Sequence, residues 1–118
     1  MTDAMTAVFA RSEPGVRAIY DRILAASRDL GPVAEEPKAT SIHLVAGSAF
    51  AGVHPKKDRL RLNLVTTGKI DSPRVRKTER VSANRWHNEV DIASPEEIDP
   101  EVLGWLNEAY RRSAQRGR

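Results

Sequence analysis

The sequence predicts an α+β domain: an antiparallel sheet of four to five strands, with N- and C-terminal helices packed on one of its faces. Two observations lead to this prediction. Apolar residues recur at helical spacing near both ends of the chain, and between those segments apolar and polar residues alternate as in half-buried strands. The 118 residues are enough for one domain with a single hydrophobic core.

The first helix is expected between Ser12 and Leu30. Ser12 is a suitable N-cap, Pro14 suits an early helical position, and Gly31-Pro32 ends the helix. Between these limits, the apolar side chains recur at positions i, i+3, i+4, i+7 and i+8. They are Val16, Ile19, Tyr20, Ile23 and Leu24. This spacing predicts one apolar stripe along the helix.

A hairpin is expected after this helix. Residues 41–46 and 49–54 are strand candidates on either side of Gly47-Ser48, a pair typical of tight turns. A short edge strand is expected at residues 33–38, where Pro37 limits the pairing because proline has no N–H to donate.

Two later segments show the clearest alternation. Residues 59–65 alternate between leucine and polar residues, and residues 85–92 alternate in the same way. Residues 77–82 are a weaker strand candidate. The helices are expected to cover the face that carries Leu60, Leu62, Leu64, Trp86, Val90 and Ile92. The opposite face then presents Arg59, Arg61, Asn63 and His87.

The last helix begins around Asp99-Pro100, and its apolar stripe consists of Val102, Leu103, Leu106, Ala109 and Tyr110. The whole chain, residues 1–118, is expected to form a single domain. Within it, residues 1–11 form an N-terminal arm, residues 12–110 the core and residues 111–118 a short basic tail.

Composition excludes several classes of site. The chain has no cysteine, which rules out disulfides, cysteine-based zinc sites and a thiol nucleophile. Residues 1–10 lack the basic start and apolar run of a signal peptide, and no stretch approaches the ~20 apolar residues of a membrane span. We therefore expect a soluble, cytoplasmic protein without a membrane partner.

Charge is distributed unevenly along the chain. Residues 54–85 contain ten basic and three acidic residues, a net charge of +7, whereas the rest of the chain carries −4. Clustered basic charge is typical of proteins with an anionic partner, nucleic acid among them. The alternative is a solvated face whose lysines and arginines protect strand edges. The candidate ligand-binding residues are Ser41, His43, Lys56, Arg59, Arg61, Arg74, Lys77, Arg80 and His87.

Motifs for catalysis are weak. The three histidines lack metal-ligand spacing, and we expect neither a metal site nor a cofactor. Ser41 and His43 share a strand face, but no Gly-x-Ser-x-Gly elbow, phosphate loop or dinucleotide motif is present. The six aromatic residues fit the core better than a base-stacking surface. Catalytic residues are therefore not assigned, and we favour a protein that is not an enzyme.

Several segments together resemble the bacterial domain of unknown function family 5655. They are residues 38–44, 49–57, 71–77, 94–99 and 105–110. The resemblance implies a binding or accessory role, because relatives occur alone or as terminal modules, and it points to a shared pocket near Ser41, His43, Lys56, Arg74, Lys77 and His87. Relatives often carry paired histidines before the valine that matches Val90. Here those positions are Asn88 and Glu89, which argues against histidine chemistry on that strand.

Three functions remain open from the sequence. The leading one is a binding module whose open, basic sheet face takes an anionic ligand. The second uses that face for a homodimer or a partner domain. The third is an enzyme that acts on a small anionic substrate through His43 or His87 together with the arginines.

Overall fold

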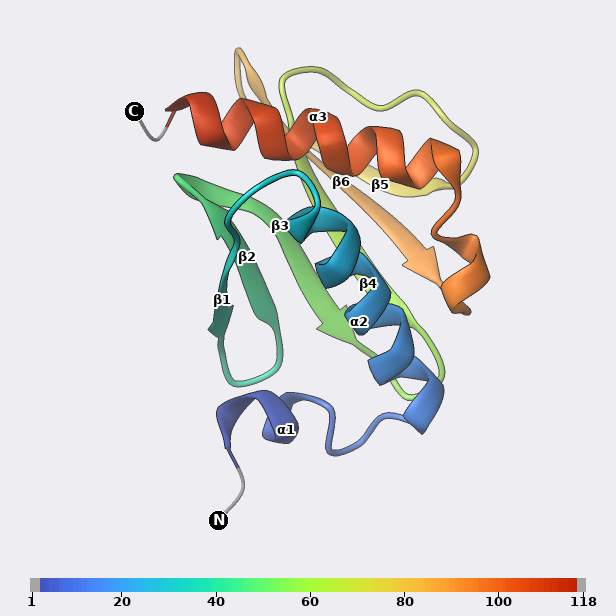
Figure 1. Ribbon diagram of the computed structural model, residues 1–118. Helices are drawn as coiled ribbons and strands as arrows, with labels where there is room; N and C mark the ends of the chain where they lie inside the picture. The colour runs from blue at the N-terminus through green and yellow to red at the C-terminus, as the bar shows by residue number, and fades with distance from the viewer. Residues whose placement is uncertain (1–2, 117–118) are drawn as a thin grey trace.

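The computed structural model describes residues 3–116. Its helices are α1 (Ala4–Val8), α2 (Pro14–Arg28) and α3 (Pro100–Arg116), with the short 3-10 helix η1 (Pro95–Glu97) before α3 (Figure 1). Its strands are β1 (Ala34–Pro37), β2 (Ile42–Ala46), β3 (Ser48–Pro55), β4 (Leu60–Thr66), β5 (Val75–Ser82) and β6 (Arg85–Ile92). The α+β class is confirmed. The prediction of four to five strands is corrected to six, since both weaker candidates, 33–38 and 77–82, contain strands.

All neighbouring strands pair antiparallel, in the order β1-β2-β3-β4-β6-β5. A simple meander, in which strands pair in chain order, would place β5 between β4 and β6, and the sheet departs from that order here. Instead, residues 67–74 carry the chain past the position of β6, and β5 pairs with the outer side of β6. The burial of the two strands explains this order. Strand β6 buries Asn88, Val90 and Ile92, whereas β5 is largely exposed and suits an edge.

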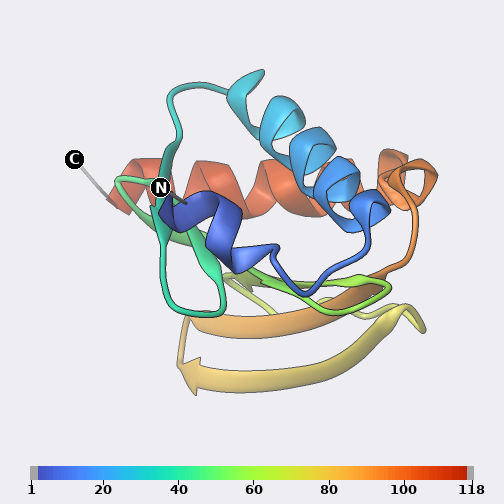
Figure 2. The ribbon, with the colours of Figure 1, turned by 90° about the horizontal axis from the view of Figure 1, so that it is seen from below.

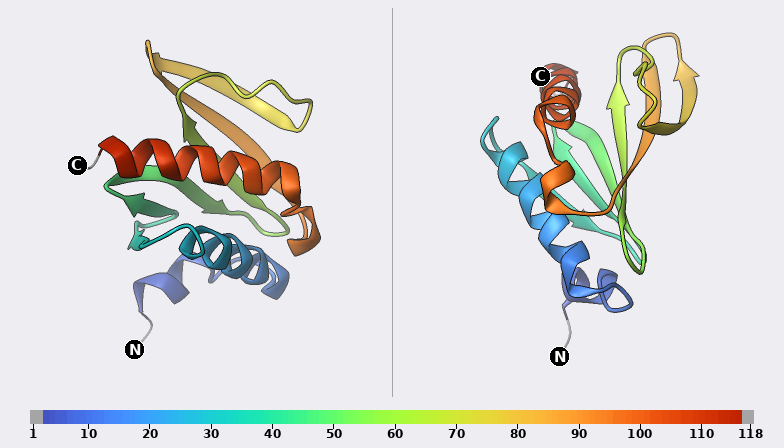
Figure 3. Two further views of the ribbon diagram at one scale, coloured as in Figure 1. Left: turned by 45° about the horizontal axis from the view of Figure 1, so that its top comes forward. Right: turned by 90° about the vertical axis from the view of Figure 1, so that its right-hand side faces the viewer.

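Both long helices cover the same face of the sheet, as predicted (Figures 2 and 3). Helix α3 packs on β2, β3 and β4, and α2 packs on β3 and β4. The leucines of β4 and the even-numbered apolar residues of β6 point into this interface. The side chains that are almost completely buried include Tyr20, Phe50, Leu60, Leu62, Leu64, Ile92 and Leu106. Alternation therefore divides the sheet into a covered face and an open face.

The N-terminal helix boundary differs from the prediction. Helix α2 begins with Pro14 at its first turn, and its N-cap is Glu13 rather than Ser12. The Ser12 hydroxyl instead donates a hydrogen bond of 2.7 Å to the backbone carbonyl of Lys56, at the end of β3. The N–H of Glu13 donates to the carbonyl of Lys57 over 2.8 Å. These bonds fix the start of α2 against the turn between β3 and β4.

The described residues near both ends of the chain form helices, where the sequence predicted an N-terminal arm and a basic tail. Residues 1–11 include α1, and Val8 and Phe9 join the hydrophobic core. Residues 111–116 continue α3 by a further turn and a half. Residues 117–118 of the predicted tail lie outside the described residues. No helix in the described part of the chain is both long and apolar enough to span a membrane.

Asn88 is a polar residue on the covered face. Its side-chain nitrogen donates to the carbonyl of Leu64 over 3.2 Å and to the hydroxyl of Thr66 over 2.9 Å. Its side-chain oxygen accepts from the backbone N–H of Ile70 over 3.1 Å. The Thr66 hydroxyl in turn donates to the carbonyl of Gly68. Asn88 thus attaches the first part of the 67–74 connection to β6.

We expect Asn88→Ala to destabilise the fold by about 2–4 kcal/mol, because it removes three buried hydrogen bonds and takes away the acceptor of the buried Ile70 N–H. Urea unfolding measures the loss. The matched control is Asn84→Ala, at the exposed turn between β5 and β6, which should change stability by less than about 0.5 kcal/mol. Equal stability of the two variants would contradict the structural role of Asn88.

Candidate functional site

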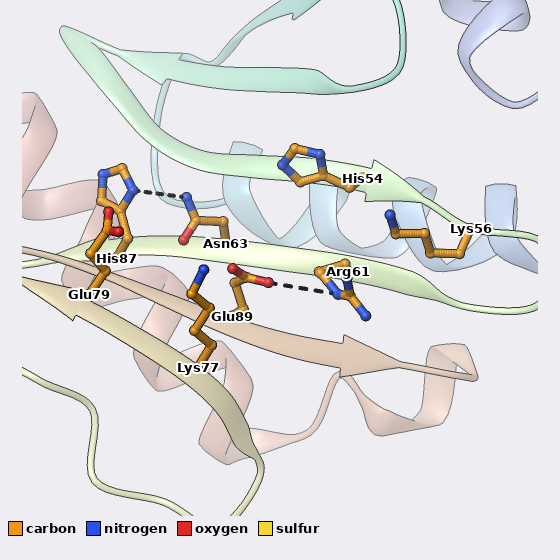
Figure 4. A pocket seen from close by; sticks show the side chains of 8 residues that line it. All are labelled: His54, Lys56, Arg61, Asn63, Lys77, Glu79, His87 and Glu89. Atoms are coloured by element: carbon orange, nitrogen blue, oxygen red, sulfur yellow. Dashed lines mark hydrogen bonds and ion pairs between the residues drawn. The ribbon is translucent and has the colours of Figure 1, made fainter.

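The open face of the sheet contains a shallow basin that spans β3 to β6. The strand register brings its side chains side by side: His54 pairs with Arg61, Asn63 with Glu89, Lys77 with Glu89, and Glu79 with His87. The basin has a volume of about 240 Å³. Figure 4 shows the eight side chains that line it. They are His54, Lys56, Arg61, Asn63, Lys77, Glu79, His87 and Glu89.

An irregularity in β5 builds one wall of the basin. Val75 pairs with Val90 and Lys77 pairs with Glu89, so Arg76 is an extra residue with no partner position in β6. In a regular strand, neighbouring side chains point to opposite faces of the sheet. At a bulge the strand bends, and two consecutive side chains can point to the same face. Arg76 contacts Glu89 at 2.9 Å, and Lys77 lines the basin. Both cations therefore face the open side of the sheet.

Carboxylates on β6 neutralise the arginines of this face. Arg61 donates to Asp91 at 2.8 Å and lies 3.8 Å from Glu89, and Arg59 lies 3.4 Å from Asp91. The hydrogen bond from Arg61 holds the pKa of Asp91 below its ordinary value, against the opposing effect of partial burial. The same bond raises the pKa of Arg61. The arginines thus form a rigid ion-pair network and are not free cations.

The two lysines of the basin differ from the arginines. Neither Lys56 nor Lys77 makes a side-chain salt bridge or hydrogen bond with another residue in the described range 3–116. Two polar atoms in the basin are also unsatisfied. The Asn63 Oδ1 and His87 Nε2 atoms are buried and have no hydrogen-bond partner among the described residues. A ligand that accepts hydrogen bonds from the two lysines would lie close to these two unsatisfied atoms.

Both histidines of the basin favour the neutral form. Burial lowers the pKa of His87, because it disfavours the charged imidazolium, and the nearby Arg85 adds to this effect. Burial likewise lowers the pKa of His54, with a contribution from Lys56. The Asn63 side-chain nitrogen lies 3.4 Å from His87 Nδ1, a contact that holds the imidazole ring against β4. At neutral pH, the unpaired positive charge of the basin therefore comes from its two lysines, because Arg61 is paired with Asp91 and Glu89.

The structure brings four of the nine predicted ligand residues into the basin: Lys56, Arg61, Lys77 and His87. Arg59 lies beside it, paired with Asp58 and Asp91. The remaining predicted residues that do not line the basin are Ser41, His43, Arg74 and Arg80. Ser41 is buried just before β2, and His43 lies one strand away from the basin, opposite Gly52. Arg80 is exposed at the edge, where it donates to the carbonyl of Ser82.

Arg74 has a structural role on the other side of the molecule. Its guanidinium donates to Asp99 at 2.9 Å, to Glu101 at 3.1 Å and to the carbonyl of Glu97 at 2.9 Å. It also lies 5.8 Å from the ring centroid of Trp105. Arg74 thus clamps the 67–74 connection to the start of α3.

Sequence reasoning did not select four lining residues: His54, Asn63, Glu79 and Glu89. Alternation in β4 and β6 already placed Asn63 and Glu89 on the open face. The same two-residue period, extended through Gly52 in β3, would have placed His54 there as well. Glu79 depends on the position of β5 next to β6, which alternation alone does not reveal. Within residues 3–116, no three His, Asp or Glu side chains cluster closely enough to hold a metal ion.

Comparison with known proteins gives one match. A family model described as "Domain of unknown function (DUF5655)" matches residues 5–113. This range contains all five segments on which the resemblance rests. No curated protein and no solved structure matches the chain.

We expect Arg74→Gln to destabilise the domain by about 1–3 kcal/mol, because it removes charge-assisted hydrogen bonds to the start of α3. Thermal or urea unfolding measures this change. Arg80→Gln makes the same change of charge at the exposed edge and should cost less than about 0.5 kcal/mol. The clamp is refuted if both variants unfold like the original protein.

Proposed function

The chain belongs to the DUF5655 family, whose description assigns no activity, and we propose that it is a binding module that holds an anionic group in the open-face basin. The observation that supports this most directly is the pair of unpartnered lysines, Lys56 and Lys77, on the walls of a concavity that also contains unsatisfied polar atoms. An oxyanion accepts hydrogen bonds from ammonium groups, and hydrogen phosphate can also donate one through its protonated oxygen.

The size of the basin favours a small group. Pockets for drug-sized ligands have volumes of roughly 300–1,000 Å³, and the basin, at about 240 Å³, is smaller. A phosphate, sulfate or carboxylate group fits this volume. We therefore propose that one such group enters the basin, with the rest of any larger ligand outside.

The ion-pair network contributes to this function by fixing geometry. Asp91 and Glu89 hold the guanidinium of Arg61, whose side chain is only 21% exposed, at the floor of the basin. The two lysines retain their charge and their conformational freedom, so that they can close on an anion. The attraction for an anion therefore comes mainly from the two lysines, and Arg61 contributes a guanidinium whose position is fixed by its carboxylate partners.

Nucleic acid would bind here through its phosphates. No Phe, Tyr or Trp side chain lines the basin, and its two imidazoles, on His54 and His87, are half-buried, so the basin lacks a platform of large exposed rings for stacking bases. Readout of base sequence also needs side chains that are free to reach base edges, whereas Arg61 is already engaged by carboxylates. The proposed recognition is of an anionic group rather than of a base.

We expect Lys77→Gln to weaken orthophosphate binding about tenfold, because one charge-assisted contact is lost. Titration of the protein with orthophosphate, followed by amide NMR shifts of β4 and β6, measures the dissociation constant. Lys69→Gln is the matched control, since Lys69 does not line the basin. If Lys77→Gln and Lys69→Gln bind orthophosphate equally well, the basin is not the site.

Anion binding should also depend on pH through the two histidines. Both pKa values lie below the ordinary value of 6.5, so both rings are neutral at about pH 7.5 and gain a proton as the pH falls through the lowered values. A protonated imidazolium attracts an anion. Sulfate affinity should therefore rise as the pH falls from about 7.5 into the range of the lowered pKa values, because sulfate itself keeps its charge while the imidazoles gain theirs.

Isothermal titration with sodium sulfate at constant ionic strength measures this dependence. The charged and titratable groups close to His87 are Glu79, Arg85 and Arg112, and those close to His54 are Lys56, Glu89, His43 and Arg61. The triple variant His43→Gln, His54→Gln and His87→Gln removes all three imidazoles, including the one that lies close enough to His54 to affect its pKa, and it should bind sulfate with the same affinity across this pH range. A rise that persists in this variant would assign the pH dependence to other groups.

A further inference from the structure

A second cavity adjoins the basin and is lined by residues of α1, of the loop between β1 and β2 and of the end of β3. Helix α1 approaches that loop at one end of the sheet (Figure 1). The cavity has a volume of about 470 Å³. We call it the N-terminal cleft. Its lining residues are Ala7, Val8, Ala10, Arg11, Ser12, Ala39, Thr40, Pro55, Lys56 and Lys57. Lys56 lines both this cleft and the basin, so the two cavities meet at one side chain.

Backbone contacts fix the walls of the cleft. The carbonyls of Lys56 and Lys57 accept hydrogen bonds from the Ser12 hydroxyl and the Glu13 N–H. The N–H of Lys56 also donates to the carbonyl of Arg59 over 2.8 Å, which closes the turn between β3 and β4. On the opposite wall, Val8 is part of the hydrophobic core. The cleft is therefore a built feature of the fold and not a gap beside a loose terminus.

The charge of the cleft is one-sided. Three of its lining residues are cations, Arg11, Lys56 and Lys57, and none is acidic. None of these cations makes a side-chain salt bridge with another residue in the described part of the chain. The neighbouring acid on the turn, Asp58, is turned toward Arg59 at 3.0 Å. By contrast, the basin contains two glutamates as well as its cations.

Small side chains leave the cleft open. Alanines line it on both sides, and Thr40 is exposed and makes no side-chain hydrogen bond within residues 3–116. An anion in the cleft would thus meet two lysines, one arginine and one free hydroxyl donor. These are the groups that bind phosphate oxygens in proteins.

We propose that the N-terminal cleft is a second anion site, and that the ligand is a linear chain of phosphate groups that runs from the basin across Lys56 into the cleft. This inference rests on the proposed function of the basin and extends it from a single anionic group to a polyanion. The phosphate chain can be an inorganic polyphosphate or the backbone of a single-stranded nucleic acid. The two share the chemistry on which recognition depends.

The test compares ligands of increasing length. The full chain is titrated calorimetrically with orthophosphate, tripolyphosphate and a polyphosphate of about fifteen units, and separately with a thymidine oligonucleotide of about the same phosphate number. The variant that removes the cleft charges is Arg11→Gln with Lys57→Gln. The matched control is Arg22→Gln with Lys69→Gln, which removes the same charges from positions that line neither cavity.

We expect the affinity to rise with chain length and the cleft variant to weaken binding of the long chain at least about tenfold, with orthophosphate binding changed less than about twofold. The slope of log Kd against log salt concentration should fall by about one for each cation removed. Whichever long ligand binds more tightly at equal phosphate number identifies the source of the chain.

Three results would overturn the inference, and they are distinguishable. If long chains bind no more tightly than orthophosphate and depend on Lys77 alone, the cleft is not a site and the basin function stands. If the long chain depends on the cleft while orthophosphate binding is unaffected by Lys77→Gln, the basin function fails as well and no ligand spans the two cavities. Equal weakening by the cleft variant and its control would show an effect of net charge only, which also excludes the cleft.

Discussion

The side-chain amide of Asn88 is the interaction on which the arrangement of the open face depends. After β4, the next strand could form a hairpin and pair directly with β4. The Asn88 amide opposes that hairpin because it binds Thr66 and Ile70 on the covered face of β6. Residues 67–74 then continue along that face to Arg74, which the start of α3 holds. Because β5 is thereby delivered to the outer side of β6, its polar side chains become one wall of the basin.

Pairing divides the basic residues into two physical kinds. Arginines on the open face meet carboxylates of β6, and each pair fixes the direction of both partners. Such exposed pairs add little to stability, but they give the sheet surface a defined shape. Lys56 and Lys77 have no such partner within residues 3–116. A net charge of +3 for the whole chain hides this division, because it counts the two kinds alike.

Much of the fold was predictable from the sequence, because apolar residues recur about every 3.6 residues in a half-buried helix and every second residue in a half-buried strand. The leucines of β4 identified the covered face, and Arg61 and His87 were correctly assigned to the open one. The strand order was not predictable, since it depends on a polar residue, Asn88, at a position where alternation favours an apolar one. The clustering of basic residues along the chain also did not reveal the ion pair of Arg74. Its partner Asp99 lies 25 residues away in the sequence, and only the tertiary structure brings the two side chains together.

The side chains of β5 that form a wall of the basin also bear on self-association of the protein through the edge of the sheet. Strand β5 leaves a row of backbone groups unpaired at the edge of the sheet, which in many proteins invites another strand to add. Here Arg76, Lys77 and Arg80 repel a second β5, and two breaks in register keep the edge from being flat. The edge is thus protected by electrostatic repulsion, and this protection weakens wherever salt or a multivalent anion screens it. An anion bound in the basin, as proposed above, would therefore also reduce the repulsion between this edge and a second copy.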